Sequence, residues 1–213
     1  MPVAAKICGL STPETLDAAI AGGATHVGFV FFPPSPRNIT LDQAMALSKR
    51  VPSHVKIVGV FVDPDNALID NAVTSAELDA IQLHKVTPER AASLKRFAST
   101  VETWAAVAVK TSTDIGQAAA YRGAADRILY DAKTPDTATL PGGMGLRFDW
   151  KLLENIPQPL PWALSGGLDA GNVREAVNVT GARLVDVSSG VERAPGVKDV
   201  AKIAAFLQAV AQC

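Results

Sequence analysis

The stretch LVDVSSGVERAPGVKD, residues 184–199, places a short apolar run directly before two serines and a glycine. A run of this length that is rich in β-branched residues and ends at turn residues is typical of a buried β-strand. The Ser-Ser-Gly that follows is, on its own, what an ordinary turn looks like. The run, at residues 184–188, is the last of eight, and the other seven lie at residues 4–8, 26–32, 56–62, 80–84, 103–109, 127–132 and 161–165.

Segments with helical spacing separate these runs, and three begin with helix start signals. Thr12 and Thr87 each precede Pro and Glu, and Thr40 precedes Leu41. Strict alternation of strands and helices implies parallel strands with right-handed crossovers, and near-continuous apolar runs fit strands that are covered on both faces. Eight such units favour an α/β fold, a closed (β/α)8 TIM barrel, over an open doubly wound sheet. The chain has 213 residues, fewer than the roughly 250 typical of this barrel, so we expect short loops.

The composition is that of an ordinary globular protein. The chain is 48% apolar and 19% charged with a formal net charge of -1, and no linker interrupts it, so we expect a single domain over residues 1–213. No run of Lys or Arg favours nucleic acid, and no apolar run is long enough to cross a membrane. The amino terminus lacks the pattern of a secretory signal, which favours a cytoplasmic protein. Cys8 and Cys213 give no disulfide framework and no metal-ligand spacing, so no metal site is expected.

Glycines and small hydroxyl residues follow each of the last three predicted strands. If the barrel closes, the carboxyl ends of its strands form one mouth, where this fold builds its active sites. Backbone N–H groups of glycine loops can approach an anion closely, and a helix amino end predicted at residues 168–172 would add partial positive charge. Any one of these loops could be an ordinary turn, but three on consecutive strands predict a phosphate site. Its candidate residues are Gly142, Gly143, Gly145, Gly166, Gly167, Ser188, Ser189 and Gly190.

Polar residues on the apolar strands are candidates for the chemistry. Alternation along a strand puts Lys6 and Cys8 on the same face of the first strand, and we expect this face to point into the barrel. Asp131 lies near the carboxyl end of the sixth strand, and we expect its side chain to point into the barrel mouth. A buried carboxylate needs a partner or a function, whereas Cys8 could be a small buried apolar residue. Lys6 and Asp186 are expected to pair, because the first and eighth strands become neighbours when the barrel closes.

Seven short motifs follow one another along the chain. They are Lys6-Ile7-Cys8-Gly9, Ser35-Pro36-Arg37, Gln82-Leu83-His84, Asp131-Ala132-Lys133, Gly142-Gly143-Met144-Gly145, Leu164-Ser165-Gly166-Gly167-Leu168 and Asp186-Val187-Ser188-Ser189-Gly190-Val191-Glu192. Together they resemble the phosphoribosylanthranilate isomerase family of tryptophan biosynthesis. The resemblance implies a single-domain (β/α)8 barrel that uses no metal or organic cofactor. It implies an isomerase that converts N-(5-phosphoribosyl)anthranilate into 1-(2-carboxyphenylamino)-1-deoxyribulose 5-phosphate by an Amadori rearrangement.

The resemblance also implies roles for individual residues. Cys8 would be the general base that removes the C2′ proton, and Asp131 the general acid that protonates the furanose ring oxygen. Arg37 would bind the anthranilate carboxylate with its planar fork, the alternative being a solvated surface arginine. The glycine loops would bind the phosphate, and Asp186 would contact substrate hydroxyls.

The sequence departs from the family pattern at two loops. Lys85-Val86-Thr87 replaces the glycine and acidic or amide residues that are common after the fourth strand. Met144 and Leu146 replace a small hydroxyl residue and a lysine after the sixth. We expect altered side-chain contacts there and the same reaction. Gln82 and His84 match the family in position and receive no role.

Two other functions remain open. The related sugar-phosphate isomerase of histidine biosynthesis is expected to use two carboxylates and to bind a phosphate at each end of its substrate. Here the first strand ends in Cys8 and not in Asp, and only one glycine-rich cluster stands out, which argues against that function. A non-catalytic barrel that binds a sugar phosphate is the other alternative, and the presence of both Cys8 and Asp131 argues against it. The expected partner is a small molecule, phosphoribosylanthranilate, with no nucleic acid and no membrane, bound by a monomer or homodimer.

Overall fold

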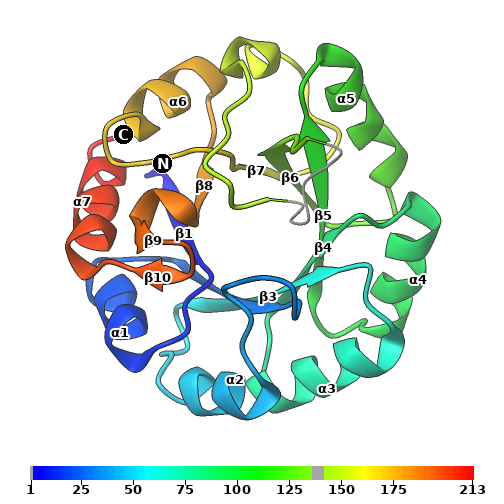
Figure 1. Ribbon diagram of the computed structural model, residues 1–213. Helices are drawn as coiled ribbons and strands as arrows, with labels where there is room; N and C mark the ends of the chain where they lie inside the picture. The colour runs from blue at the N-terminus through cyan, green and yellow to red at the C-terminus, as the bar shows by residue number, and fades with distance from the viewer. Residues whose placement is uncertain (1, 136–141) are drawn as a thin grey trace.

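The structure is a computed structural model that describes residues 2–135 and 142–213. Eight parallel strands close into a barrel in sequence order, and helices surround them, as Figure 1 shows along the barrel. The prediction of a closed (β/α)8 barrel is therefore confirmed. The strands are β1 (Ala4–Cys8), β2 (His26–Phe31), β3 (Lys56–Val62), β4 (Ala80–His84), β5 (Glu102–Val109), β6 (Arg127–Ala132), β7 (Trp162–Leu164) and β8 (Leu184–Val187).

The helices follow the strands with two local differences from strict alternation. The α5 helix (Ser112–Gly116) is only about one turn long before it continues as the 3-10 helix η1 (Gln117–Tyr121). The described residues between β6 and β7 contain only the 3-10 helix η2 (Trp150–Leu153). Residues 136–141, which follow β6, lie outside the described residues. The helices are α1 (Pro13–Ala21), α2 (Leu41–Ser48), α3 (Asn66–Ala76), α4 (Pro88–Phe97), α5 (Ser112–Gly116), η1 (Gln117–Tyr121), η2 (Trp150–Leu153), α6 (Val173–Thr180) and α7 (Val200–Val210).

The barrel closes where the first strand meets the last. β1 pairs with β2 on one side and with β8 on the other, in a register that sets Lys6 beside Asp186. Because each of the eight barrel strands has two hydrogen-bonded neighbours, the barrel sheet has no open edge. Closure also fixes which side chains of β1 and β8 meet inside.

Three predicted helix starts are confirmed by their caps. The side chains of Thr12, Thr40 and Thr87 each accept a hydrogen bond from a backbone N–H in the first turn of α1, α2 and α4. Thr40 and Gln43 form a reciprocal capping box. Local sequence was sufficient here because a cap is built from residues three apart.

The helix start predicted at residues 168–172 falls at the end of that range, since Asn172 is the N-cap residue and α6 begins at Val173. Asn172 uses both ends of its amide to hold a turn in the preceding residues. Its Oδ1 accepts from the N–H of Asp169 at 2.9 Å, and its Nδ2 donates to the carbonyl of Gly167 at 3.0 Å. The amino end of α6 is thus separated from the β7 carboxyl end by a turn.

A small extra unit follows β8, in a segment for which the sequence analysis predicted no strand. It consists of a 3-10 helix, η3 (Ser189–Val191), and a two-stranded hairpin of β9 (Glu192–Ala194) and β10 (Val197–Lys198). The hairpin lies between β8 and α7 at the edge of the barrel mouth in Figure 1. It carries two charged side chains into the protein, as described below.

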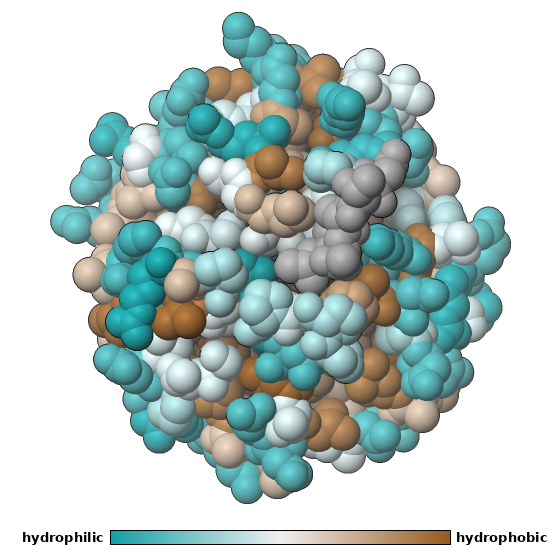
Figure 2. Space-filling model, viewed as in Figure 1, coloured by the Kyte–Doolittle hydropathy of each residue, from teal (hydrophilic) through white to brown (hydrophobic). Residues whose placement is uncertain are grey.

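The core has an outer shell and an inner filling, and the predicted strand faces are confirmed. Ile7, Ile128 and Tyr130 point outward into the shell between the strands and the helices. Leu129 points inward into a cluster at the amino-terminal end of the barrel, and Cys8 points inward among valines near the other end. The rim of the molecule in Figure 2 is mostly hydrophilic. None of the helices in the described part of the chain is long and apolar enough to cross a membrane.

Candidate active site

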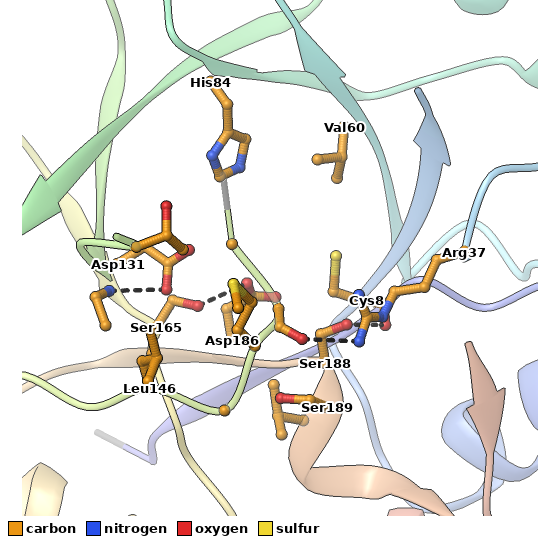
Figure 3. A pocket seen from close by; sticks show the side chains of 18 of the residues that line it. Cys8, Arg37, Val60, His84, Asp131, Leu146, Ser165, Asp186, Ser188 and Ser189 are labelled. Carbon is orange, nitrogen blue, oxygen red and sulfur yellow. Dashed lines mark hydrogen bonds between the residues drawn. The ribbon is translucent and has the colours of Figure 1, made fainter. Parts of the chain in front are cut away.

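A pocket opens at the carboxyl ends of the strands, where the sequence predicted it (Figure 3). Apolar side chains of β2 and β3 form one wall, and the loops after β6, β7 and β8 form the opposite wall. All but one of the predicted site residues line it. Those that do are Cys8, Arg37, Asp131, Gly142, Gly143, Gly145, Gly166, Gly167, Asp186, Ser188 and Ser189.

Gly190 is the exception, since it does not line the pocket. A Cβ on Gly190 would collide with the carbonyl of Leu168, so this glycine allows the β8 loop to pack against the β7 loop. Its position is set by close backbone packing within the wall, and a contact of Gly190 with phosphate stays a prediction.

Asp131 ends β6 with its carboxyl group in the pocket, and its side chain is nearly buried. Its Oδ1 accepts a hydrogen bond from the N–H of Ala132 at 2.9 Å. Burial, followed by repulsion from Asp186, raises the pKa of Asp131 to about 7. A carboxyl group in this state holds a proton through a large part of the neutral range, as a general acid must.

Cys8 ends β1 on the other side of the pocket in Figure 3, and its thiol is buried. Burial raises the pKa of this thiol, while the ammonium of Lys6 works in the opposite direction. Gly28 of β2 makes room for both groups. A Cβ at Gly28 would lie 3.0 Å from the Cys8 Sγ and 3.1 Å from the Lys6 Nζ. The sequence could have identified Gly28, because a glycine inside an apolar strand often indicates that another group approaches its backbone closely.

Lys6 and Asp186 form the predicted ion pair inside the barrel. The Nζ of Lys6 donates to Asp186 Oδ1 at 2.8 Å, and the Lys6 side chain is completely buried. Burial acts to lower the pKa of Lys6, but attraction to Asp186 and Cys8 outweighs it and the pKa is raised. The other carboxylate oxygen of Asp186 accepts from Ser165 Oγ at 3.2 Å. A contact of Asp186 with substrate hydroxyls stays a prediction.

Arg37 is buried, with 5% of its surface exposed, so the alternative of a solvated surface arginine is wrong. Its Nε and Nη2 donate to the two carboxylate oxygens of Glu192 at 2.7 and 2.8 Å. Nη2 also donates to the carbonyl of Gly143 at 2.9 Å. One edge of the guanidinium fork is therefore occupied by a protein carboxylate. Sequence reasoning gave Glu192 no role, although a carboxylate that follows the last strand of the mouth was visible.

The glycine loops expose backbone where a side chain would not fit. Gly143, Gly145, Gly166 and Gly167 all have positive φ, and a Cβ at Gly166 would lie 2.7 Å from the backbone nitrogen of Ala132. Phosphate binding by these loops stays a prediction. The two departures from the family pattern in the β6 loop also reach the pocket: Met144 and Leu146 line it and are among the exposed large apolar residues.

His84 and Gln82 lie at the pocket from β4, although they were assigned no role. Burial lowers the pKa of His84 to about 4, so the imidazole is neutral, and Gln82 Nε2 donates to its Nε2 at 2.8 Å. Gly142 lies between this ring and Asp131, because a Cβ there would approach both. His84 is thus a neutral polar group beside the buried carboxyl group. No group of three His, Cys, Asp or Glu side chains that could hold a metal ion occurs within residues 2–135 and 142–213.

Comparison with known protein families identifies the family of this chain. The family model described as N-(5'phosphoribosyl)anthranilate (PRA) isomerase matches residues 5–209. The chain belongs to the phosphoribosylanthranilate isomerase family. Sequence relatives agree: the chain is 55% identical over 211 residues to N-(5'-phosphoribosyl)anthranilate isomerase of Zymomonas mobilis subsp. mobilis, with 99% of each chain covered. It is 52% identical over 213 residues to the protein of that name from Rhodospirillum centenum, again with 99% of each covered.

Solved structures of the phosphoribosylanthranilate isomerase family share the fold. The isomerase of Thermotoga maritima superposes with a TM-score of 0.88 at 36% identity and covers 99% of this chain and 100% of its own. A second structure holds reduced 1-(o-carboxyphenylamino)-1-deoxyribulose 5-phosphate, with a TM-score of 0.85, 33% identity and the same coverage. A third describes monomers generated from the dimeric Thermotoga maritima protein, with a TM-score of 0.84 at 35% identity, covering 99% of this chain and 100% of its own. The chain is therefore an isomerase of tryptophan biosynthesis, as the resemblance implied.

Proposed function

We propose that this isomerase rearranges N-(5-phosphoribosyl)anthranilate into 1-(2-carboxyphenylamino)-1-deoxyribulose 5-phosphate with Asp131 as general acid and Cys8 as general base. The observation that carries the assignment is the pair of buried acid and base groups in one pocket, one a carboxyl group with its pKa raised to about 7. Two groups match the two proton transfers that the reaction needs.

The first transfer opens the sugar ring. Asp131 gives its proton to the furanose ring oxygen as the bond from that oxygen to C1′ breaks, and the nitrogen lone pair forms the C1′=N bond of a Schiff-base cation. Asp131 is left as a carboxylate. The second transfer removes the proton on C2′ to Cys8, and the C–H electron pair forms an enolamine that becomes the ketose.

Two anchors would hold the substrate across this pair. We assign the phosphate to the backbone of Gly143, Gly167 and the Ser189 loop, and the anthranilate carboxylate to Arg37. The pocket supports this assignment because the glycine loops lie on the β6–β8 side while Arg37 comes from the loop after β2. Holding both ends fixes C1′ and C2′ between the acid and the base.

Cys8 can act as a base only as a thiolate, which its burial disfavours. Lys6 lies next to the thiol, because one Cβ position at Gly28 is about 3 Å from both groups, and its charge favours the thiolate, but that charge is paired with Asp186. The Schiff-base cation supplies a further positive charge next to the thiol during the reaction. A larger fraction of Cys8 is therefore thiolate after ring opening, when the C2′ proton is removed.

The test is to form phosphoribosylanthranilate in solution and to follow the decay of its fluorescence with added protein over a range of pH. We expect acceleration, and kcat/KM that rises about tenfold per pH unit up to about 7 and then levels, because above 7 the loss of protonated Asp131 offsets the gain of thiolate. Unchanged decay at every pH would overturn the proposed function. A profile that keeps rising beyond pH 8 would remove Asp131 from the role of acid.

We also propose that residues 1–213 act as one catalytic domain, as a monomer or homodimer in the cytoplasm. One related protein is described as dimeric, which supports the homodimer. Sedimentation equilibrium at assay concentrations distinguishes the two states.

A further inference from the structure

A buried cluster of three charges lies behind the pocket wall, and the mechanism above uses only one member. Arg37, Glu192 and Lys198 are 5, 7 and 6% exposed. Glu192 Oε1 accepts from both cations, from Arg37 Nε at 2.7 Å and from Lys198 Nζ at 2.7 Å. The cluster holds two cations and one carboxylate, so it carries an excess positive charge at the edge of the pocket.

The contacts leave one end of Arg37 free within the described part of the chain. Among residues 2–135 and 142–213, the side chain of Arg37 donates only from Nε and Nη2, to Glu192 and to the carbonyl of Gly143. Nη1 lies against Gly143, since a Cβ there would be 2.6 Å from it, and both residues line the pocket. The amino group that has no protein acceptor among residues 2–135 and 142–213 is thus the one on the pocket side.

Glu192 is itself held rigidly. Lys198 Nζ donates to Ser188 O at 2.8 Å as well as to Glu192, which ties the carboxylate to the end of β8. The backbone N–H of Gly196 approaches Glu192 Oε2 at 3.3 Å. Gly196 also packs on the carbonyl of Pro36, where a Cβ would collide. The β9–β10 hairpin therefore contacts the loop that carries Arg37 in two ways, through the Gly196 backbone against Pro36 and through the Glu192 side chain.

We propose that Glu192 is a positioning residue that holds the Arg37 guanidinium with Nη1 toward the pocket, so that the substrate carboxylate meets a donor already in place. The proposal rests on the assignment of that carboxylate to Arg37. A free arginine side chain has many rotamers, and a two-point contact on one edge of the guanidinium selects one of them before the ligand arrives. The excess positive charge of the cluster remains for the substrate.

Two other roles for the cluster make different predictions. If Glu192 only stabilises the hairpin, its loss lowers stability and affects all ligands alike. If Glu192 acts only through its charge, removing that charge strengthens the binding of every anion. Positioning alone makes the effect specific for the ligand group that Arg37 contacts.

The experiment compares two ligands and two backgrounds. The ligands are reduced 1-(2-carboxyphenylamino)-1-deoxyribulose 5-phosphate and its phenylamino counterpart, which lacks the carboxylate. Their dissociation constants are measured by calorimetry for the native protein, for Glu192→Gln, for Arg37→Met and for the double variant. Glu102→Gln serves as a matched control, because Glu102 pairs with Arg127 at 3.2 Å at the opposite end of the barrel.

We expect the native preference for the carboxylate ligand to fall about 10- to 100-fold in Glu192→Gln, with little change for the phenylamino ligand. Adding Glu192→Gln to Arg37→Met should change the preference no further, and Glu102→Gln should leave it intact. Should Glu192→Gln fail to fold, Glu192→Asp keeps the charge and shortens the reach, and the same loss is expected.

An equal loss for both ligands, a gain for both, or an additive effect in the double variant would overturn the positioning role. A native protein with no preference for the carboxylate would overturn both this inference and the binding role of Arg37. The fluorescence assay would still report the isomerase reaction in that case, so the two failures are distinguishable.

Discussion

The end of β6 and the middle of β8 each bury an aspartate in the same barrel, with opposite results. Asp186 holds the ammonium of Lys6 at 2.8 Å and functions as a counter-ion. Asp131 has no cation within ion-pair distance in the part of the chain that the structure describes, and burial raises its pKa to about 7. The difference teaches that a neighbouring cation, and not burial alone, decides whether a buried carboxylate serves structure or proton transfer.

The largest expected effect is on turnover when Asp131 loses its acid function. Asp131→Asn keeps the shape and the acceptor for the Ala132 N–H but has no proton to give. We expect kcat to fall by about 10²–10⁴-fold, the contribution typical of a positioned acid, with the affinity for the reduced product little changed. Steady-state kinetics and calorimetry check this. Near-normal kcat would mean that another group protonates the ring oxygen.

The next effect is on stability when the partner of Asp186 is removed. Lys6→Met leaves a buried carboxylate without a cation, and breaking such a pair costs about 3–5 kcal/mol of unfolding free energy. Lys56→Met is the matched control, because Lys56 pairs with Asp79 at 2.7 Å with 54% of its side chain exposed. A solvent-exposed pair contributes little to stability, so the loss in Lys56→Met should be much smaller. Urea unfolding of both variants tests the contrast, and equal losses would contradict it.

The smallest expected effect is on stability, and it differs in sign between the two aspartates: replacing Asp by Asn should raise the free energy of unfolding at Asp131 and lower it at Asp186. Asp131 has a folded-state pKa of about 7, above its unfolded value, so its ionisation opposes folding increasingly as pH rises from about 4 to 7. Asp131→Asn should therefore stabilise the protein above pH 7, by at most about 4 kcal/mol, and not below pH 4. Asp186→Asn should destabilise it, because Lys6 is left buried and unpaired. Melting temperatures of both variants at pH 5 and pH 8 test this prediction. Stabilisation by both substitutions would contradict the different roles of Asp131 and Asp186.

Patterns within a few residues were enough to predict the barrel. Each strand is an apolar run, and helix starts such as Thr12 are capped by their immediate neighbours. The Lys6–Asp186 pair was also predictable, since strand alternation and barrel closure together bring the two side chains face to face. Both kinds of prediction depend on rules that do not require knowing how loops fold.

The surroundings of Arg37 could not be predicted in this way. Glu192 is 155 positions away, and its contact depends on the β9–β10 hairpin, which the sequence did not predict. The turn before α6 was not predicted either, because it depends on the Asn172 amide bonding to the backbone of Asp169 and Gly167. Such features arise from side chains that bond to distant or irregular backbone, for which no periodic pattern exists.

The pair that closes the barrel also sets the order of events on the ribosome. Lys6 and Asp186 are 180 positions apart, so the first strand leaves the exit tunnel long before its partner is made. Until β8 emerges, β1 has an unpaired edge and Lys6 remains hydrated. A nascent chain that stalls before residue 184 therefore exposes an open sheet edge to chaperones and proteases. The edge of β1 is covered only after β8 has been synthesised and has paired with it.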